Sequence, residues 1–335
     1  MKTKIKLSIL DQSPISIGME PADALQATID LAKHGEMLGY ERFWVAEHHD
    51  LFGLASSNPA VLLSAIGART SKIRLGAGAV LLPYYKPFHV AETYNLLATL
   101  YPDRIDLGLG RAPGGSAEVS LALSNNYLAG VREFPGKIDE LTYFLRGNFP
   151  GNHQFANLTP TPLPSVSPDL WLLGTSEKSG ALAATKGMKY AFGHFMTDRN
   201  GPGILANYRE KMKKHHPEKE AEVIVAINVI CAETTKKAEE LAMSQFLWKV
   251  RQHMEDADHR VPTITTAKDY PYTKEELKKL AEYKKQTIIG DPHEVRDQLL
   301  KLDKKYKADE YMIVTIVHNP EDKRRSYTLL KEAIK

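Results

Sequence analysis

The sequence predicts an α/β protein folded as a single (β/α)8 TIM barrel. Short apolar runs alternate along the whole chain with longer segments of helical period, which is typical of strand–helix units around a parallel sheet. Eight such runs are present. Eight strand–helix units fit a closed barrel better than an open doubly wound sheet, which stays the alternative. No internal repeat or change of composition marks a linker, so residues 1–335 are expected to form one domain.

The predicted strands are short apolar runs followed by glycine or polar residues. In chain order they cover residues 5–10, 42–47, 73–82, 104–110, 170–175, 190–195, 222–230 and 310–317. Between them, apolar residues recur three or four positions apart, which indicates helices that bury one face. The clearest faces are Leu25, Ile29 and Ala32; Val295, Leu299, Leu302 and Tyr306; and Tyr327, Leu330 and Ile334. Asp291 followed by Pro292 predicts a helix start, because aspartate caps helices and proline suits their first position.

Three stretches are longer than a minimal barrel needs. They cover about residues 112–131, 148–168 and 252–285; the first two are rich in Pro, Gly and Asn, and the third is polar and dense in charge. Long loops in a compact domain usually act as lids or binding segments. We therefore expect inserted loops at the carboxyl ends of the strands, with 252–285 as a lid.

Composition excludes several classes of function. The chain is 43% hydrophobic and 25% charged, with a net charge of +3 over 335 residues, which gives no reason to expect nucleic acid or an anionic membrane as partner. The single cysteine, Cys231, excludes an internal disulfide and a multi-cysteine metal site. It lies in an apolar run, so we expect a buried, inert thiol. No segment is apolar enough for a signal peptide or a membrane span, and a cytoplasmic location is expected.

Polar residues follow the predicted strands where chemistry in a barrel occurs, at the carboxyl ends. The segment GLGRAPGG (108–115) is not a dinucleotide fingerprint, because proline stands where the third glycine should be. Instead, Arg111 offers a fork of donors to an anion. Thr175, Ser176 and Ser179 surround the start of the next helix, where free N–H groups favour a phosphate. Together they predict one phosphate site, which suits a mononucleotide. The alternatives are a structural ion pair for Arg111 and an ordinary N-cap for Ser176.

The stretch AEHHDLFG (46–53) places two histidines after the second strand. They could bind a metal with Glu47 and His194, handle a proton, or only pack. Adjacent residues point to opposite sides of a strand, so both histidines could reach one ion only beyond the strand's end. The HExxH spacing of zinc sites is absent as well. We therefore expect no metal site here.

Five motifs occur in order on this pattern: AEHH, LGAGAVLLP, GLGRAPGG, GTSEKSGALAATKG and IIGDPHEVRDQL. With them the chain resembles the bacterial-luciferase-like flavin monooxygenases over nearly its whole length. The resemblance implies that a flavin ring lies over the barrel mouth, beside a bulge in the third strand with a non-proline cis peptide at Ala77-Gly78. It also implies that Arg111 holds the flavin phosphate.

The resemblance further assigns cofactor-binding roles. These fall to Ala77, Gly78, Gly110, Arg111, Gly174, Thr175, Ser176 and Ser179. His48 and His49 are the implied catalytic pair; we expect His48 to face the flavin and handle a proton, and His49 to be structural. The light-emitting enzyme has a reactive cysteine where this chain has Gly110, so neither light emission nor a long-chain aldehyde substrate is expected.

The implied activity is oxygenation of a small organic substrate with reduced FMN and dioxygen. Because no second nucleotide fold is present, a separate flavin reductase would have to supply the reduced FMN. A homodimer is also implied, with Phe88 and Tyr94 as candidate interface residues. Two alternatives stay open: hydride transfer with a deazaflavin, and a non-catalytic flavin-binding protein.

Overall fold

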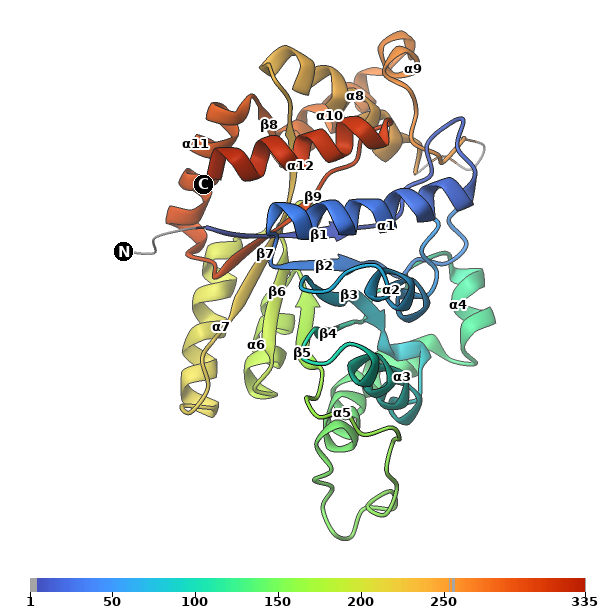
Figure 1. Ribbon diagram of the computed structural model, residues 1–335, viewed down its shortest axis with the longest axis vertical. Helices are drawn as coiled ribbons and strands as arrows, with labels where there is room; N and C mark the ends of the chain where they lie inside the picture. Colours follow the sequence, from blue (N-terminus) through green and yellow to red (C-terminus); the bar gives the residue numbers. More distant parts are fainter. Residues whose placement is uncertain (1–4, 253, 255–256, 335) are drawn as a thin grey trace.

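Eight parallel strands close into a barrel in the computed structural model of the chain (Figure 1). The structure describes residues 5–252, 254 and 257–334. Around the barrel the order is β1-β2-β3-β4-β5-β6-β7-β9, and β9 pairs again with β1. The strands are β1 (Lys6–Asp11), β2 (Arg42–Val45), β3 (Arg74–Leu81), β4 (Ile105–Gly110), β5 (Asp169–Gly174), β6 (Lys189–Gly193), β7 (Val223–Cys231) and β9 (Glu310–Val314). The predicted fold class is confirmed, and each predicted run lies on one of these strands.

Each barrel strand is followed by a helix that packs its apolar face on the sheet. These helices are α1 (Pro21–Leu38), α2 (Pro59–Gly67), α3 (Pro87–Leu100), α5 (Tyr127–Arg146), α6 (Glu177–Thr185), α7 (Gly201–His215), α11 (Pro292–Tyr306) and α12 (Pro320–Ile334). Two 3₁₀ turns, η1 (Leu82–Tyr84) and η2 (His194–Met196), follow β3 and β6. The predicted start of α11 is confirmed, because Asp291 Oδ1 accepts hydrogen bonds from the amides of His293 at 2.9 Å and Glu294 at 3.0 Å.

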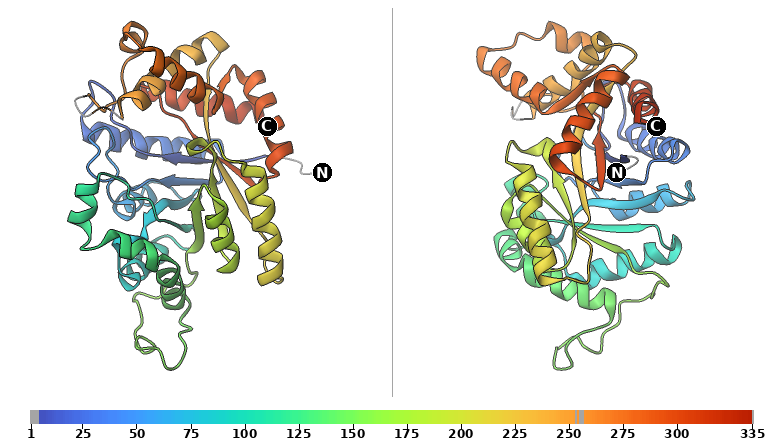
Figure 2. Two further views of the ribbon diagram at one scale, coloured as in Figure 1. Left: turned by 180° about the vertical axis from the view of Figure 1, so that it is seen from behind. Right: turned by 90° about the vertical axis from the view of Figure 1, so that its left-hand side faces the viewer.

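A ninth strand, β8 (Thr287–Gly290), is present that the sequence did not predict. It pairs with residues 228–231 of β7, starting at Asn228, the last residue of β7 that pairs with β9. Together with α8 (Thr235–Arg251), α9 (Ile264–Asp269) and α10 (Lys274–Lys285) it forms an inserted unit between β7 and α11. Four residues between two charged helices are too short to show a strand period. Figures 1 and 2 show α8, α9 and α10 as a separate layer at one end of the molecule.

The long connections differ from expectation in two ways. The stretch 252–285 is mostly helical, since it holds α9 and α10; residues 253, 255 and 256 within it lie outside the described residues. The stretch 112–131 follows β4, as expected, and contains α4 (Ala117–Leu123). The stretch 148–168, however, joins α5 to the start of β5. It therefore lies at the amino ends of the strands, away from the predicted face, and projects from the molecule in both figures.

Charged side chains close the amino end of the barrel. Arg42, at the start of β2, donates to Glu310 Oε1 at 2.8 Å and to Asp106 Oδ2 at 2.9 Å. Asp106 also accepts from Trp44 Nε1 at 2.9 Å and from Arg74 Nη2 at 2.7 Å. Because Asp106 is fully buried, its charge depends on these partners for stabilisation. This ion cluster holds the starts of the four strands β2, β3, β4 and β9 together, at the end opposite the polar residues that follow the strands.

The proposed interface residues do not form an exposed surface. Tyr94 is buried in the core of the monomer, and Phe88 packs on Phe144 with ring centroids 5.0 Å apart. The prediction for Tyr94 is therefore wrong, because helix α3 turns this side chain inward. Cys231 is buried as expected, and burial raises the pKa of its thiol to about 12. Among the described residues, no helix is both long and apolar enough to span a membrane.

Candidate active site

The carboxyl ends of the strands surround a cavity of about 380 Å³, here called the barrel cavity. Every barrel strand contributes to its lining, with Leu10, Trp44, Gly78, Gly110, Leu173, Ala191, Ala226 and Met312 taken from the eight strands in turn. Most of these side chains are apolar or small, whereas the rim carries Glu47, His48, Arg111 and Ser176. An apolar floor with a few polar groups at the edge is typical of a cofactor site.

A bulge in β3 shapes one wall of the barrel cavity. Ala77 pairs with Leu107 and Val80 with Leu109, so β3 carries one extra residue between these pairs. The cis peptide lies within the bulge at Gly78-Ala79, one bond later than predicted. Ala77 is still held in regular pairing and is fully buried in the core. It does not line the cavity, whereas Gly78 does, so its contact with a cofactor stays a prediction.

His49 belongs to a hydrogen-bond network behind the cavity wall. Its Nε2 lies 2.9 Å from Glu47 Oε1, which also accepts from the hydroxyl of Tyr85 at 2.7 Å. The other carboxylate oxygen of Glu47 accepts from the amide of Leu81 at 3.1 Å. These bonds tie the end of β2 to the end of β3. His49 does not line the barrel cavity, which places it where a structural residue would lie.

His48 lines the barrel cavity itself. Its Nδ1 is buried and has no hydrogen-bond partner among the described residues. Burial, and then the neighbouring His49, lower the pKa of His48 to about 4, so the ring is neutral at pH 7. A neutral imidazole offers one donor and one acceptor. The ring therefore has an unused nitrogen beside the cavity.

Glycines of the GLGRAPGG motif let the loop after β4 approach the loop after β2. Gly114 has a φ of +67°, and its carbonyl accepts from the amide of His49 at 2.8 Å. A Cβ added at Gly115 would lie 2.3 Å from the carbonyl oxygen of His49. A side chain at this position would push the two loops apart. The motif thus fixes the histidine loop against the segment that carries Arg111.

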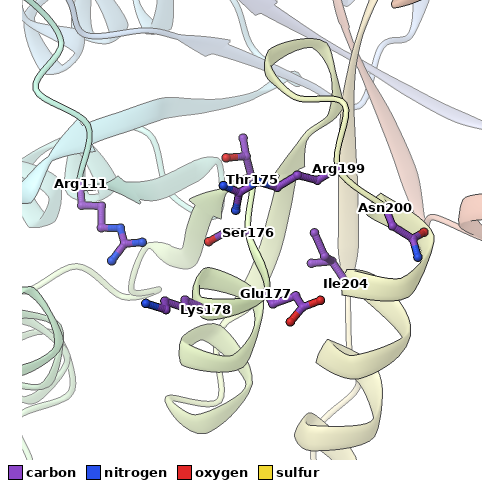
Figure 3. A pocket seen from close by; sticks show the side chains of 8 residues that line it. All are labelled: Arg111, Thr175, Ser176, Glu177, Lys178, Arg199, Asn200 and Ile204. Carbon is purple, nitrogen blue, oxygen red and sulfur yellow. The ribbon is translucent and has the colours of Figure 1, made fainter.

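A groove of about 660 Å³ adjoins the barrel cavity at Arg111, Thr175 and Ser176. It contains three cationic side chains, Arg111, Lys178 and Arg199, beside the start of α6 (Figure 3). We call it the cationic groove. Arg111 points into it from the end of β4, and Arg199 reaches toward Thr175 from the connection after β6. None of the three cations has an ion pair with another described residue, so Arg111 is not used as a structural ion pair there.

The start of α6 forms the floor of the cationic groove. Ser176 caps the helix, since its Oγ accepts from the amide of Ser179 at 3.3 Å. The alternative assignment of Ser176 as an N-cap is therefore correct. Ser176 still lines both the barrel cavity and the cationic groove. The hydroxyl of Ser179 donates to the Ser176 carbonyl oxygen at 2.7 Å and lies 2.9 Å from the hydroxyl of Tyr190. A Cβ at Gly174 would lie 2.3 Å from Ser179 Oγ. Thr175 and Ser176 are thus the hydroxyls best placed for an anion.

Three of the residues considered as metal ligands, Glu47, His49 and His194, have other partners. The part of the chain that the structure describes contains no group of three or more His, Cys, Asp or Glu side chains arranged to hold a metal ion. His194 Nδ1 lies 2.9 Å from the hydroxyl of Tyr306, and the Glu47 carboxylate is shared by His49, Tyr85 and Leu81.

Comparison with known proteins identifies the family. The sequence profile described as luciferase-like monooxygenase matches residues 5–306. The chain belongs to the luciferase-like monooxygenase family. N-acetyl-S-alkylcysteine monooxygenase of Bacillus subtilis (strain 168) is 39% identical over 332 residues, 98% of each chain. A luciferase-like monooxygenase of Escherichia coli (strain K12) is 33% identical over 97% of this chain and 96% of its own.

Solved structures of other proteins have the same fold. Apo-MsnO8 superposes with a TM-score of 0.90 at 36% identity and covers 98% of both chains. Two less similar structures share the fold alone. One is the oxygenating constituent of 3,6-diketocamphane monooxygenase in complex with FMN, at 17% identity, TM-score 0.72 and 99% and 98% coverage of the two chains. The other is an F420-dependent secondary alcohol dehydrogenase, at 14% identity and a TM-score of 0.67, with 99% of this chain and 100% of that chain covered.

Sequence reasoning missed two polar residues of this luciferase-like site, Lys178 and Arg199, which line the cationic groove. It considered Glu47 only as a metal ligand, whereas Glu47 joins the ends of β2 and β3. Lys178 stands in the first turn of α6, so the motif GTSEKSG contained the signal. Arg199 belongs to no motif; only its position shortly after the sixth strand pointed to it.

Proposed function

We propose that the protein is a flavin-dependent monooxygenase that uses reduced FMN and dioxygen to oxygenate a small organic substrate. The observation that supports this most is that the apolar barrel cavity opens into a groove with a helix start and three cations that form no ion pair with any described residue. Bound reduced FMN would supply the electrons that activate dioxygen. Membership of the luciferase-like monooxygenase family supports the same reaction type.

The residues present fit FMN. Arg111, Thr175, Ser176 and the first amides of α6 would hold the phosphate, because donors and a positive helix end favour an anion. The flavin ring would lie in the barrel cavity against Gly78 and Gly110. A Cβ at Gly110 would approach the Cβ of Ala79 to 2.9 Å, so a larger residue would disturb this wall.

A deazaflavin remains the alternative cofactor, because it also joins a flat ring to a phosphate. The relative of 39% identity is named as a monooxygenase, and this supports FMN and oxygen transfer over hydride transfer. In a non-catalytic flavin-binding protein, by contrast, bound flavin would cause no substrate turnover.

Two partners belong to the proposal. A separate flavin reductase would supply reduced FMN. Homodimer formation is supported by exposed apolar side chains on neighbouring helices α2 and α3, namely Val61, Leu96 and Leu100.

His48 is proposed to handle a proton at the flavin. We expect His48→Gln to lower kcat for coupled oxygenation on the order of 100-fold, because glutamine fills similar space but cannot transfer a proton. The assay supplies chemically reduced FMN and air. It scores product by mass spectrometry over a substrate panel that includes an N-acetyl-S-alkylcysteine.

His49→Gln is the matched control. This residue contacts Glu47 and does not line the barrel cavity, so its kcat should stay within about tenfold of the wild type. Equal rates for His48→Gln and the wild type would refute the proton role. The proposed function would be contradicted if wild-type protein binds reduced FMN but forms no oxygenated product from any compound of the panel.

A further inference from the structure

A second cavity of about 490 Å³ adjoins the barrel cavity on the side of the inserted unit. The two share the lining residues Gln12, His48, Phe195 and Met196. The second cavity continues between β7, β9, α8 and α10, and we call it the α8 cavity. A molecule bound there would meet His48 at one end and the inserted unit at the other. This position suits a substrate that reacts beside the flavin.

Two buried amide side chains line the α8 cavity. Asn228 of β7 is 1% exposed and Gln245 of α8 is fully buried. Both the nitrogen and the oxygen of each amide lack a hydrogen-bond partner among the described residues. Buried polar groups in native proteins are nearly always satisfied by protein, water or ligand. A side-chain amide offers donors and an acceptor, and it can therefore pair with a secondary amide of a ligand.

A single cation lines the same cavity. Lys249 is half-buried on α8, one turn after Gln245. Its ammonium lies 4.8 Å from the ring centroid of Tyr283, and it forms no ion pair with any described residue. Burial lowers the pKa of Lys249 to about 8, so most molecules still carry the charge at pH 7. An unpaired, partly desolvated ammonium favours a ligand carboxylate.

The remaining walls of the α8 cavity are largely apolar. The apolar lining residues are Leu51, Leu54, Phe195, Val314 and Ile316, beside the further polar side chains Gln252, His259 and Gln286. Phe195 borders the barrel cavity together with His48, and Leu51 and Leu54 follow His48 in the loop after β2. An apolar tail is therefore favoured near His48, and polar groups are favoured near Gln245 and Lys249 of α8.

We propose that the α8 cavity is the organic-substrate site and selects a small monocarboxylate that carries a secondary amide and an apolar tail. Lys249 binds the carboxylate, Asn228 and Gln245 bind the amide, and the tail extends toward His48. This assignment of a substrate class rests on the proposed function. One cation matches one negative charge, so dianionic ligands such as phosphate esters are disfavoured.

The test compares two ligands that differ only in the group at the carboxylate position. N-acetyl-L-methionine carries the carboxylate, amide and apolar tail, and N-acetyl-L-methionine amide is its neutral counterpart. Calorimetric titration of FMN-loaded wild-type protein is expected to show at least tenfold tighter binding of the acid. Lys249→Met should abolish this preference with FMN affinity unchanged, and Lys249→Arg should retain most of it.

The outcomes separate the substrate site from the cofactor site. Equal affinity for the two ligands, no binding of either, or a preference that persists in Lys249→Met would overturn the assignment. The same titrations on protein without FMN decide the question if FMN fails to bind. In that case the proposed function is wrong, whereas a Lys249-dependent preference for the acid would still support the carboxylate site.

Discussion

Arg111→Ala is expected to weaken FMN binding about 10- to 100-fold. Arg111 lines both the barrel cavity and the cationic groove. Glu177 also lines the groove, but no described carboxylate forms an ion pair with the Arg111 guanidinium. A hydrogen bond to a charged group contributes about 1.5–3 kcal/mol, which corresponds to this range in affinity. Quenching of flavin fluorescence during titration gives the dissociation constant directly.

Two controls separate phosphate recognition from general damage. Arg132→Ala removes an exposed arginine of α5 away from the groove and should leave FMN affinity unchanged. Riboflavin has no phosphate, so its affinity should be the same for wild type and Arg111→Ala. If Arg111→Ala binds FMN as tightly as the wild type, the assignment of the phosphate site to this groove is wrong.

Asp106→Asn is expected to lower the free energy of unfolding by about 3–5 kcal/mol, because it removes the negative charge from a buried ion cluster and leaves its arginine charges uncompensated. The carboxylate accepts from Arg42, Arg74 and Trp44 at the amino end of the barrel. Asparagine has nearly the same shape but turns one acceptor into a donor that faces these arginines. Denaturant unfolding followed by circular dichroism measures the change.

Asp103→Asn provides the matched control for this cluster. Asp103 Oδ1 also lies 3.8 Å from Arg74 Nη1, but the side chain of Asp103 is 80% exposed. Exposed ion pairs contribute about 0–1 kcal/mol, so this variant should unfold close to the wild type. An Asp106→Asn variant as stable as Asp103→Asn would mean that the cluster does not hold the barrel together.

The strands and barrel helices were predictable because each must bury apolar surface with its own period. Val295, Leu299 and Tyr306 of α11 are all buried, as their spacing required. The strand β8 was not predictable from a period, because Thr287–Gly290 has four residues and its pairing depends on the extra length of β7. The stretch 148–168 lies at the amino ends of the strands because it begins where α5 ends. The composition of a loop does not indicate at which end of the strands it lies.

The site was predictable where residues follow strand ends, and less so where backbone geometry decides. Arg111, Thr175, Ser176 and His48 do lie around connected cavities. Ala77 does not, because the bulge starts one residue later. The α8 cavity was not foreseen at all. Lys249 lies on an ordinary amphipathic helix, and only the packing of the inserted unit places it on the same cavity as His48.

Anaerobic titration with reduced FMN, reduced riboflavin and reduced F420 tests the central claim most directly. The claim is that the barrel cavity and the cationic groove together bind reduced FMN. The expected result is saturable binding of FMN, with riboflavin about 10- to 100-fold weaker because it cannot use Arg111 and the α6 start, and with F420 weaker than FMN. Tightest binding of F420, or equal binding of FMN and riboflavin, would contradict the claim.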